Sequence, residues 1–570
     1  MNMAHYTLLL NTCFLIVVCA FMVVHLQLPE VVDVDDHTDN SFSNITTDQD
    51  CNSLHNHDDY KHKCLYLKSN DPCVSQGYID YLFFFYCKLG RFPLLAYTLL
   101  ILWLLVLFYM LANTTCQYFC PSLENLSKFL RLSPTIAGVT LLSLGNGASD
   151  VFSSLVSFQG SGTQSIGFYT VLGGVSFVTC VVVGLVSISI RNKSVGVIKS
   201  AFVRDVCFLF LVLLFLFSIL ISGEINVLGA VGFTLLYGLY VVVVYVSSTR
   251  WKDGCDGEHQ EGVVGVDGVA DIVENLNVQL LNSIEKGFID ENEMNDVKEK
   301  RNWCLGSSIW RNSLYALEMP LYLPRRLTIP VVCEENWSKP FAVGSVILAP
   351  VLLLVIWVPF NGENFMSTFM IYGIGLLIGI VLGIAAILTT NMSAPPPRKW
   401  LFPWLAGGFL MSVTWSYISA QELVGLLVSI GYICGISPSI LGLTVLAWGN
   451  SLGDLMTNLT LAINGGSEGA QIAISGCYAG PIFNTLVGLG LSLVTCTWSQ
   501  YPQSVVITKD LYLWETMGFL VIGLIWALVV LIRKDMKFNG LLGVGLLVIY
   551  FVSLFLRLVQ SKGSLDLDQF

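Results

Sequence analysis

The sequence predicts an all-α polytopic membrane protein with two inverted five-helix repeats and extra spans, and three observations support this fold class. Of the 570 residues, 54% are hydrophobic and 12% are charged, whereas an ordinary soluble domain is about 25% charged. Apolar runs close to the roughly 20 residues that cross a hydrocarbon core recur along most of the chain. One apolar segment in each half also has the same sequence motif, which indicates an internal duplication.

Residues 1–92 precede the predicted membrane core. Residues 1–27 contain an apolar stretch that no Lys or Arg precedes, as in a signal peptide or an uncleaved anchor. Residues 28–92 form a predicted non-cytoplasmic region with a glycosylation acceptor at Asn44 and four cysteines, which are Cys51, Cys64, Cys73 and Cys87. Four cysteines permit three disulfide pairings in an oxidising compartment, and the sequence neither chooses among them nor excludes unpaired thiols.

The membrane part is predicted to divide into two repeats on either side of a loop. The first transmembrane repeat, residues 93–246, has five predicted spans, at 93–112, 134–158, 167–190, 203–221 and 227–246. The polar segment 247–340 has no sustained apolar periodicity. We therefore expect a cytoplasmic loop that either binds a regulator or only links the two halves.

The second half begins with two additional spans within residues 341–388, at 341–358 and 365–388. Residues 389–557 form the predicted second transmembrane repeat, with spans at 400–420, 438–463, 470–495, 511–532 and 541–556. Residues 558–570 form a tail.

Basic residues in the short loops predict the orientation of the spans. With the cysteine-containing region outside, the cytoplasmic loops hold most of these residues, namely Lys128, Arg131, Arg191, Lys193, Lys199, Arg204, Arg398, Lys399, Arg533, Lys534 and Lys537. Lys509 alone lies in a connection on the opposite side, so the positive-inside rule and the cysteines agree. No basic stripe interleaved with aromatic residues occurs elsewhere, so we expect membrane lipid, and no nucleic acid, as a partner.

The internal repeat lies at residues 133–150 and 437–454. These segments align without gaps as SPTIAGVTLLSLGNGASD and SPSILGLTVLAWGNSLGD, with nine identical positions, where chance supplies roughly one or two. In the predicted topology the first copy runs outward and the second runs inward. Inverted repeats of this kind are the usual construction of secondary transporters, with the ion site near the membrane midplane.

Each copy of the motif places one carboxylate deep in an apolar span, at Asp150 and Asp454. An ionised Asp at such a position costs several kcal/mol, so the pair predicts an ion site or a water-filled cavity rather than a packing surface. Asn146 and Asn450 precede the acids by four residues. On a helix this spacing places an amide oxygen and a carboxylate on one face, one turn apart.

Small and hydroxylated residues around the acids add to the predicted site. Gly147 loosens the first helix, and Ser149 and Ser451 supply hydroxyl oxygens. Broken helices also free backbone carbonyls, and hard cations prefer oxygen ligands of these kinds. After the second copy, Gly480 precedes Asn484, whose amide oxygen is a further candidate ligand from the next span.

The two halves differ at the position equivalent to Asn484. The first half has the apolar Val178 there, so Ser176 and Thr179 are its only further candidate ligands. The predicted site is therefore lopsided. Its two carboxylates balance one Ca²⁺, two monovalent cations or protons, and coupled exchange follows if the loaded site can change sides while the empty, charged site cannot.

Two other function classes also fit parts of this pattern. A cation channel would use the same oxygen ligands, and only counter-ion dependence separates it from an exchanger. An intramembrane aspartyl protease needs two buried acids, and Gly453-Asp454 matches part of a Gly-x-Gly-Asp motif. Ser451 occupies the first Gly position of that motif, however, and the paired Asn residues have no role in such an enzyme. We therefore expect no enzyme activity.

The segments GNGASDVFSS and GNSLGDLMTN resemble the alpha repeats of the Ca²⁺/cation antiporter superfamily. The sequence is most similar to its plant-type cation/calcium exchanger branch, which is related to the sodium/calcium exchangers. The resemblance implies ten core spans in two inverted groups of five. It also implies ion ligands at the matching motif positions, which are Asn146, Gly147, Asp150, Asn450, Ser451, Asp454, Gly480 and Asn484.

The resemblance implies cation antiport without a cofactor, but it leaves the ions open. The better-known sodium/calcium exchangers have Thr-Ser where this chain has Asn146-Gly147 and Asn450-Ser451. The expected cargo is Ca²⁺, K⁺ or Na⁺, exchanged for Na⁺ or H⁺. The same branch implies the plasma membrane or an endomembrane, such as that of the vacuole, ER or Golgi, and not the mitochondrion.

Overall fold

The computed structural model describes residues 59–69, 77–119, 121–122, 143–159, 164–191, 198–255, 322–332, 337–357, 365–391, 396, 398–464, 466–507 and 511–567. Several predicted features lie outside these residues: the leader at 1–27, the sequon, Cys51, Cys73, the first half of the first motif at 133–142 and the loop residues 256–321. Asn146 belongs to a described helix, but its side chain is outside the described set.

Ten described helical segments are long and apolar enough to cross a membrane, and each overlaps a predicted span. They are Pro93–Phe119, Ile166–Ser189, Lys199–Ser222, Val227–Ser247, Lys339–Ile356, Phe369–Thr389, Leu401–Cys434, Gly469–Ser499, Tyr512–Arg533 and Gly540–Gln560. The two remaining predicted spans are the motif segments, whose helices are richer in Gly, Ser and Asn. The prediction of an all-α, multi-pass membrane protein is confirmed.

Contacts divide the chain into two units. The first comprises residues 1–23, 101–141 and 259–419, and the second comprises residues 24–100, 142–258 and 420–570. The long helices α4 (Pro93–Thr114, continued by the π-helical turn η4, Thr115–Phe119) and α17 (Arg398–Cys434) each cross from one unit to the other.

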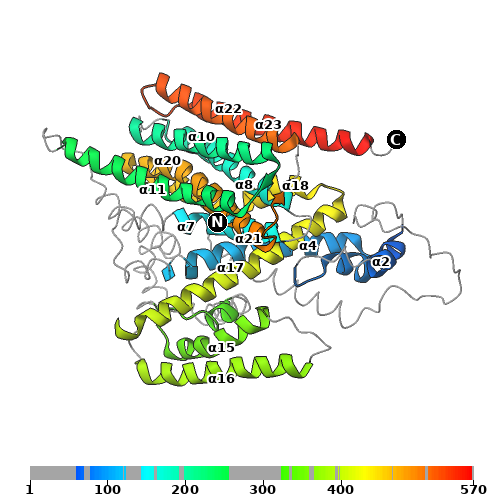
Figure 1. Ribbon diagram of the computed structural model, residues 1–570. Coiled ribbons are helices and arrows are strands. Elements are labelled where there is room, and N and C mark those ends of the chain that lie inside the picture. The colour runs from blue at the N-terminus through cyan, green and yellow to red at the C-terminus, as the bar shows by residue number, and fades with distance from the viewer. Residues whose placement is uncertain are drawn as a thin grey trace, which may run out of the picture. The chain divides into compact units, whose positions relative to one another are not determined.

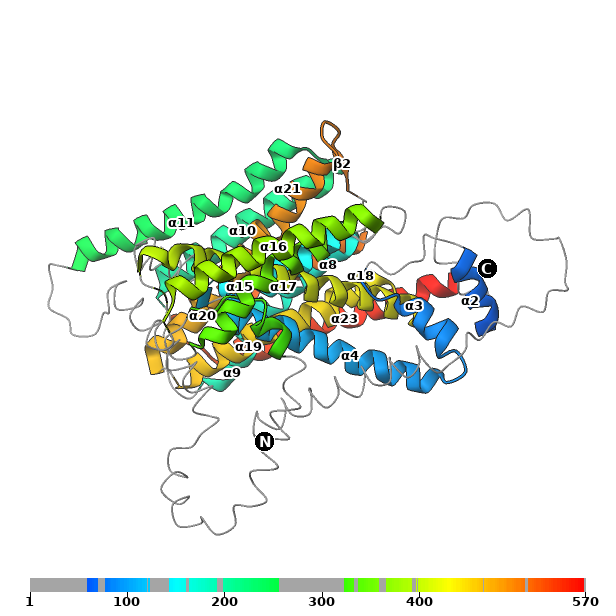
Figure 2. The ribbon, with the colours of Figure 1, turned by 90° about the horizontal axis from the view of Figure 1, so that it is seen from below.

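The first unit contains the helical hairpin of α15 (Lys339–Trp357) and α16 (Phe365–Thr389), which lie side by side in Figures 1 and 2. Their backbones approach closely at Gly379, where an added Cβ would lie 2.2 Å from the carbonyl oxygen of Ile347. Small residues allow such contacts between membrane helices, which gain no hydrophobic stabilisation from packing in lipid.

A short segment at residues 322–332 also packs within the first unit. Arg325 donates from Nη1 to Oδ1 of Asn113 at 2.5 Å, and the indole N–H of Trp415 donates to the hydroxyl of Thr328 at 2.7 Å. These bonds fasten the end of the predicted cytoplasmic loop to α4 and to α17.

The second unit contains the remaining helices. In chain order they are α2 (Tyr60–Ser69), α3 (Tyr81–Phe83), η3 (Phe84–Lys88), α7 (Ser143–Gln159), α8 (Gln164–Ser176), η6 (Phe177–Val182), α9 (Val183–Ser189), α10 (Lys199–Ser222), α11 (Val227–Cys255), α18 (Pro438–Leu441), η8 (Gly442–Leu446), α19 (Ala447–Asn464), α20 (Gly466–Phe483), η9 (Asn484–Leu489), α21 (Gly490–Ser499), α22 (Leu511–Arg533) and α23 (Gly540–Leu567). Two short strands, β1 (Glu224–Ile225) and β2 (Val505–Val506), complete it.

The π-helical turns η6 and η9 interrupt the same span in the two halves. Each begins at or directly after a Phe, Phe177 in the first half and Phe483 in the second, next to Val178 and Asn484, which the sequence analysis treats as equivalent positions. π-Helical turns widen a helix locally and are frequent at functional sites. Their matched positions support the duplication predicted from the sequence.

Two contacts each join a pair of inter-helix segments that the predicted topology places on the same side of the membrane. Strand β1, between α10 and α11, pairs antiparallel with β2, between α21 and α22, and both connections are predicted to be outside. At the start of α10, the backbone N–H of Ile198 donates to Oε1 of Gln471 near the start of α20 at 2.9 Å, and both are predicted to be inside. These contacts place each pair of connections on one common side, as the predicted topology requires.

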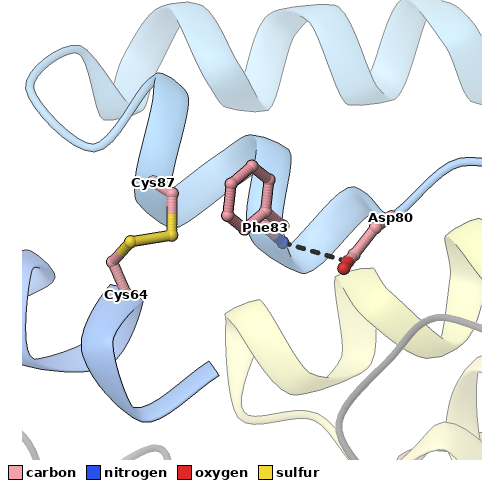
Figure 3. Close-up of a disulfide and its surroundings, with 4 residues drawn as sticks. All are labelled: Cys64, Asp80, Phe83 and Cys87. Carbon is pink, nitrogen blue, oxygen red and sulfur yellow. Dashed lines mark hydrogen bonds between the residues drawn. A yellow bond between two sulfur atoms is a disulfide. The ribbon is translucent and has the colours of Figure 1, made fainter. Parts of the chain in front are cut away.

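Helices α2, α3 and η3, which precede the first span, form a small region that we call the cap. Cys64 of α2 and Cys87 of η3 form a disulfide, and Asp80 caps α3 by accepting the N–H of Phe83 at 3.1 Å, as Figure 3 shows. This pairing is one of the three that the sequence allows. The cap is also bound to α17, because the hydroxyl of Tyr81 donates to Oε2 of Glu422 at 2.5 Å.

Candidate cation-binding site

The two repeat helices α7 and α19 meet in the interior of the second unit. Helix α7 packs against α8, α19, α20 and the π-helical turn η9. Asp150 of α7 is 3% exposed and Asp454 of α19 is 6% exposed, so neither carboxylate faces lipid. The two motifs are in direct contact, because the backbone carbonyl of Asn450 on α19 accepts the hydroxyl of Ser149 on α7 at 3.3 Å. The structure therefore brings the two predicted acids into one buried region.

Asp150 lies beside Asn484, the residue predicted to add an amide from the following span. The amide Nδ2 of Asn484 donates to Oδ2 of Asp150 at 2.5 Å. The other carboxylate oxygen, Oδ1, is buried without a hydrogen-bond partner, and so is Oδ1 of Asn484. One oxygen on each residue thus remains available to a ligand.

Gly147 makes this approach of Asn484 possible. A Cβ at Gly147 would lie 2.0 Å from Oδ1 of Asn484 and 3.0 Å from the ring of Phe483. Real Cβ atoms are not found this close to another heavy atom. Any larger residue at this position would therefore push the amide away from Asp150.

Asn450 connects the second motif to the first. Its backbone carbonyl accepts the hydroxyl of Ser149 at 3.3 Å, and its side-chain Oδ1 accepts the hydroxyl of Ser153 at 3.4 Å. Its amide nitrogen Nδ2 is buried without a partner. The α7 and α19 motifs are therefore joined directly through polar atoms rather than through apolar packing alone.

Ser451 completes the cluster near Asp150. Its hydroxyl is fully buried and has no hydrogen-bond partner. A Cβ added at Gly174 of α8 would lie 3.5 Å from Oγ of Ser451 and 3.8 Å from Oδ1 of Asp150. The backbone of α8 at Gly174 thus bounds a small space that the oxygens of Asp150 and Ser451 share.

Asp454 is bonded to the next turn of its own helix. The backbone carbonyl of Asp454 accepts Nδ2 of Asn458 at 2.8 Å. Gly480 lies on α20, four residues before Asn484, is half-buried, and a Cβ there would meet no atom within 4 Å. Its part in the site stays a prediction.

The first half has fewer side-chain oxygens at the equivalent position. Val178 stands at the position of Asn484 and is buried in η6 without any polar atom. Thr179 donates its hydroxyl to the carbonyl of Val175 on its own helix at 2.7 Å, and Ser176 is buried nearby. Their hydroxyl oxygens remain candidate ligands, but the hydrogen bond from Thr179 to Val175 stays within its own span.

Three polar residues beside the site are absent from the sequence-based set. Ser153 bonds Asn450, Ser154 lies 2.9 Å from Ser492 in a hydroxyl pair between α7 and α21, and Asn458 bonds Asp454. Each of them follows Asp150 or Asp454 by three or four residues, a helical spacing that could have indicated them as neighbours of the acids. Membrane serines usually bond a carbonyl of their own helix, however, as Ser157 does, and this makes the signal weak.

The donor set suits a transport site for hard cations. Among the described residues no three His, Cys, Asp or Glu side chains gather as a metal site would require. The site instead combines two carboxylates with neutral amide and hydroxyl oxygens. Three of its buried oxygens, on Asp150, Ser451 and Asn484, have no hydrogen-bond partner in the protein. Oxygen ligands of this kind bind Ca²⁺ and alkali cations, and a site with few charges releases them more readily.

Comparison with known proteins identifies one matching family and several similar chains. The sequence pattern of the family described as sodium/calcium exchanger protein matches residues 100–246 and 404–559. Cation/calcium exchanger 2 of Arabidopsis thaliana is 52% identical over 92% of this chain and 94% of its own length. The mitochondrial sodium/calcium exchanger protein of Rattus norvegicus is 31% identical over 89% of each chain. A crystal structure of an H⁺/Ca²⁺ exchanger aligns at 13% identity and a TM-score of 0.42, covering 84% of this chain and 92% of that one.

Proposed function

Because the chain belongs to the sodium/calcium exchanger family, we propose that this cation antiporter binds its transported ions between Asp150 and Asp454, on the two repeat helices. The observation that carries the proposal is the burial of both acids in one region together with the unpartnered oxygens of Asp150, Ser451 and Asn484. A cation bridging these oxygens satisfies them and neutralises the repulsion between the two carboxylates.

The charges of the site support exchange rather than free conduction. An empty site with two ionised acids is costly to move through the centre of a membrane, whereas one loaded with a divalent cation, two monovalent cations or protons is close to neutral. The loaded states alone then change sides readily, and this couples the two fluxes. Asn484, Ser451, Asn450 and Ser149 supply neutral oxygens that position the ions.

We propose Ca²⁺ as the principal cargo and Na⁺ or H⁺ as the exchanged ion, with K⁺ as a competing cargo. Relatives whose names include calcium or sodium support the first two ions. The site has only two carboxylates, and its other candidate ligands are neutral. Proteins that buffer Ca²⁺ use more carboxylates for tight binding, so this ligand set supports a weaker site that can release its cargo. No resident cofactor is proposed.

We also propose that the protein acts in the plasma membrane or in an endomembrane such as that of the vacuole, ER or Golgi. The similarity to the Arabidopsis exchanger favours this location over the mitochondrion, since the rat mitochondrial protein is less similar. We propose that the predicted cytoplasmic loop binds a regulator. The hydrogen bonds of Arg325 and Thr328 at the end of the loop would then couple a movement of the loop to helices of the first unit.

Isotope flux in reconstituted vesicles tests the site. Asp150→Asn and Asp454→Asn should each abolish Ca²⁺ uptake driven by a Na⁺ or H⁺ gradient, because each removes a charge that the cation needs. The matched control is Asp205→Asn, which changes another buried acid, 2% exposed, that bonds Arg204 and Tyr240 away from the site. This control should retain flux within about twofold.

The assignment fails if either site variant transports at the normal rate while inserting normally. Uptake that proceeds equally well without any counter-ion on the opposite side would instead contradict antiport and favour the channel. Expression and monodispersity of each variant in detergent separate loss of transport from loss of folding.

A further inference from the structure

A buried arginine that is not among the candidate cation ligands lies near one end of α23. Arg557 is only 6% exposed, although the same helix carries exposed apolar residues such as Val548, Val552 and Phe555. Its guanidinium carbon lies 3.7 Å from the ring centre of Tyr512 on α22 and 5.0 Å from that of Tyr169 on α8. The charge is therefore held between two aromatic rings from two neighbouring helices.

The guanidinium edge lacks partners. Nε and Nη1 of Arg557 are both buried and make no hydrogen bond, and in the part of the chain that the structure describes no carboxylate pairs with this residue. The tyrosine rings stabilise the positive charge through their faces, but ring faces do not satisfy N–H donors directed from the guanidinium edge. Unpaired N–H groups of a buried charge are costly, so an oxyanion at this edge is strongly favoured.

The three residues share one level of the membrane. Tyr512 begins its span, Tyr169 is close to the start of the span Ile166–Ser189, and Arg557 lies three residues before the end of the span Gly540–Gln560. Three helical residues rise roughly 4.5 Å. The guanidinium is therefore at the boundary of the hydrocarbon region, where lipid phosphates lie and where tyrosines are enriched.

We propose that Arg557, held between Tyr169 and Tyr512, binds the phosphate group of a membrane phospholipid. Phosphate oxygens accept hydrogen bonds from arginine in a charge-assisted geometry that neutral lipids do not offer. In the predicted topology this end of α23 is on the non-cytoplasmic side, so the lipid belongs to that leaflet. The proposed phosphate site uses none of the candidate cation ligands.

Lipid titration of the full-length protein in a neutral detergent tests the proposal. Phosphatidylglycerol should raise the thermal midpoint by several degrees and remain bound in native mass spectrometry, whereas diacylglycerol with the same acyl chains should do neither. Arg557→Met, which keeps the length of the side chain without its charge, should weaken the apparent affinity for phosphatidylglycerol by about tenfold or more. Arg533→Met is the matched control, because Arg533 is an exposed arginine in the last turn of α22.

The source of the phosphate and the fold of the variants are controlled separately. Stabilisation by inorganic phosphate at matched ionic strength, lost in Arg557→Met, would support the phosphate site and assign it to the free ion. Arg557→Lys keeps the charge but not the planar guanidinium, so it decides the question if Arg557→Met does not fold, and it should bind less tightly than the wild type. Equal effects of phosphatidylglycerol and diacylglycerol on the wild type, or unchanged affinity in the Arg557 variants, would overturn the proposal.

Discussion

The contact between Gly147 and Asn484 allows a quantitative test of the cation site. In Gly147→Ala the new Cβ would lie 2.0 Å from Oδ1 of Asn484, about 1.4 Å closer than the 3.4 Å at which ordinary contact begins (3.4 minus 2.0). The amide must move by a similar amount. Such a displacement breaks its 2.5 Å hydrogen bond to Oδ2 of Asp150.

The expected loss follows from the kind of bond that breaks. A hydrogen bond to a charged group contributes about 1.5–3 kcal/mol, and each 1.4 kcal/mol corresponds to about tenfold in affinity. We therefore expect the apparent affinity for the transported cation to fall roughly 10- to 100-fold in Gly147→Ala. Concentration dependence of ⁴⁵Ca²⁺ uptake into vesicles measures it.

Two further variants show whether the effect comes from the clash. Gly453→Ala makes the same change on the other repeat helix, where a Cβ would meet no atom within 4 Å, and should stay within about twofold of the wild type. Adding Gly147→Ala to Asn484→Ala should cause little further loss, because the oxygen that clashes is already gone. Wild-type affinity in Gly147→Ala, or an equal loss in Gly453→Ala, would refute the geometry.

Three other predictions concern stability and the cap. Glu422→Ala removes the acceptor for Tyr81, and its loss of about 1–3 kcal/mol should lower the thermal midpoint in detergent; an unchanged midpoint would mean that the cap does not bind α17. Gly379→Val should destabilise the α15–α16 hairpin, whereas Gly373→Val, where a Cβ meets no atom within 4 Å, should not, as thermal unfolding can show. Thiol labelling of denatured protein should modify Cys64 only after reduction, and labelling without reduction would exclude its disulfide.

The membrane spans follow well from the sequence, because span length and apolar composition depend on the bilayer and not on packing partners. The span predicted at 400–420 is the clearest exception. Its helix α17 continues to Cys434, whereas the apolar pattern is interrupted at Gln421 and Glu422. Glu422 is tolerated there because Tyr81 from the cap supplies a hydrogen bond, and a contact over such a sequence separation leaves no local signal.

The acids of the candidate site were identified because two copies of one motif repeat them at equal positions. Asn484 was predicted from its amide oxygen on the span after the second motif, although symmetry places the apolar Val178 at the equivalent position. The rotation of each helix about its axis cannot be derived in this way. The structure alone supplies the bond from Ser153 to Asn450 and the closeness of Gly147 to Asn484, since both depend on how α7 faces α19 and η9.

The strand pair β1–β2 limits how the second unit can move. Two backbone-paired residues from each connection, with a further bond from the N–H of Ile507 to the carbonyl of Gly223 at 2.8 Å, tie α10 and α11 to α21 and α22. Main-chain ladders of this kind hold their ends at fixed separation whatever the side chains do. We therefore expect these helix ends to move less relative to one another at that face, so that a path for ions there opens more readily along helices that the ladder does not fasten.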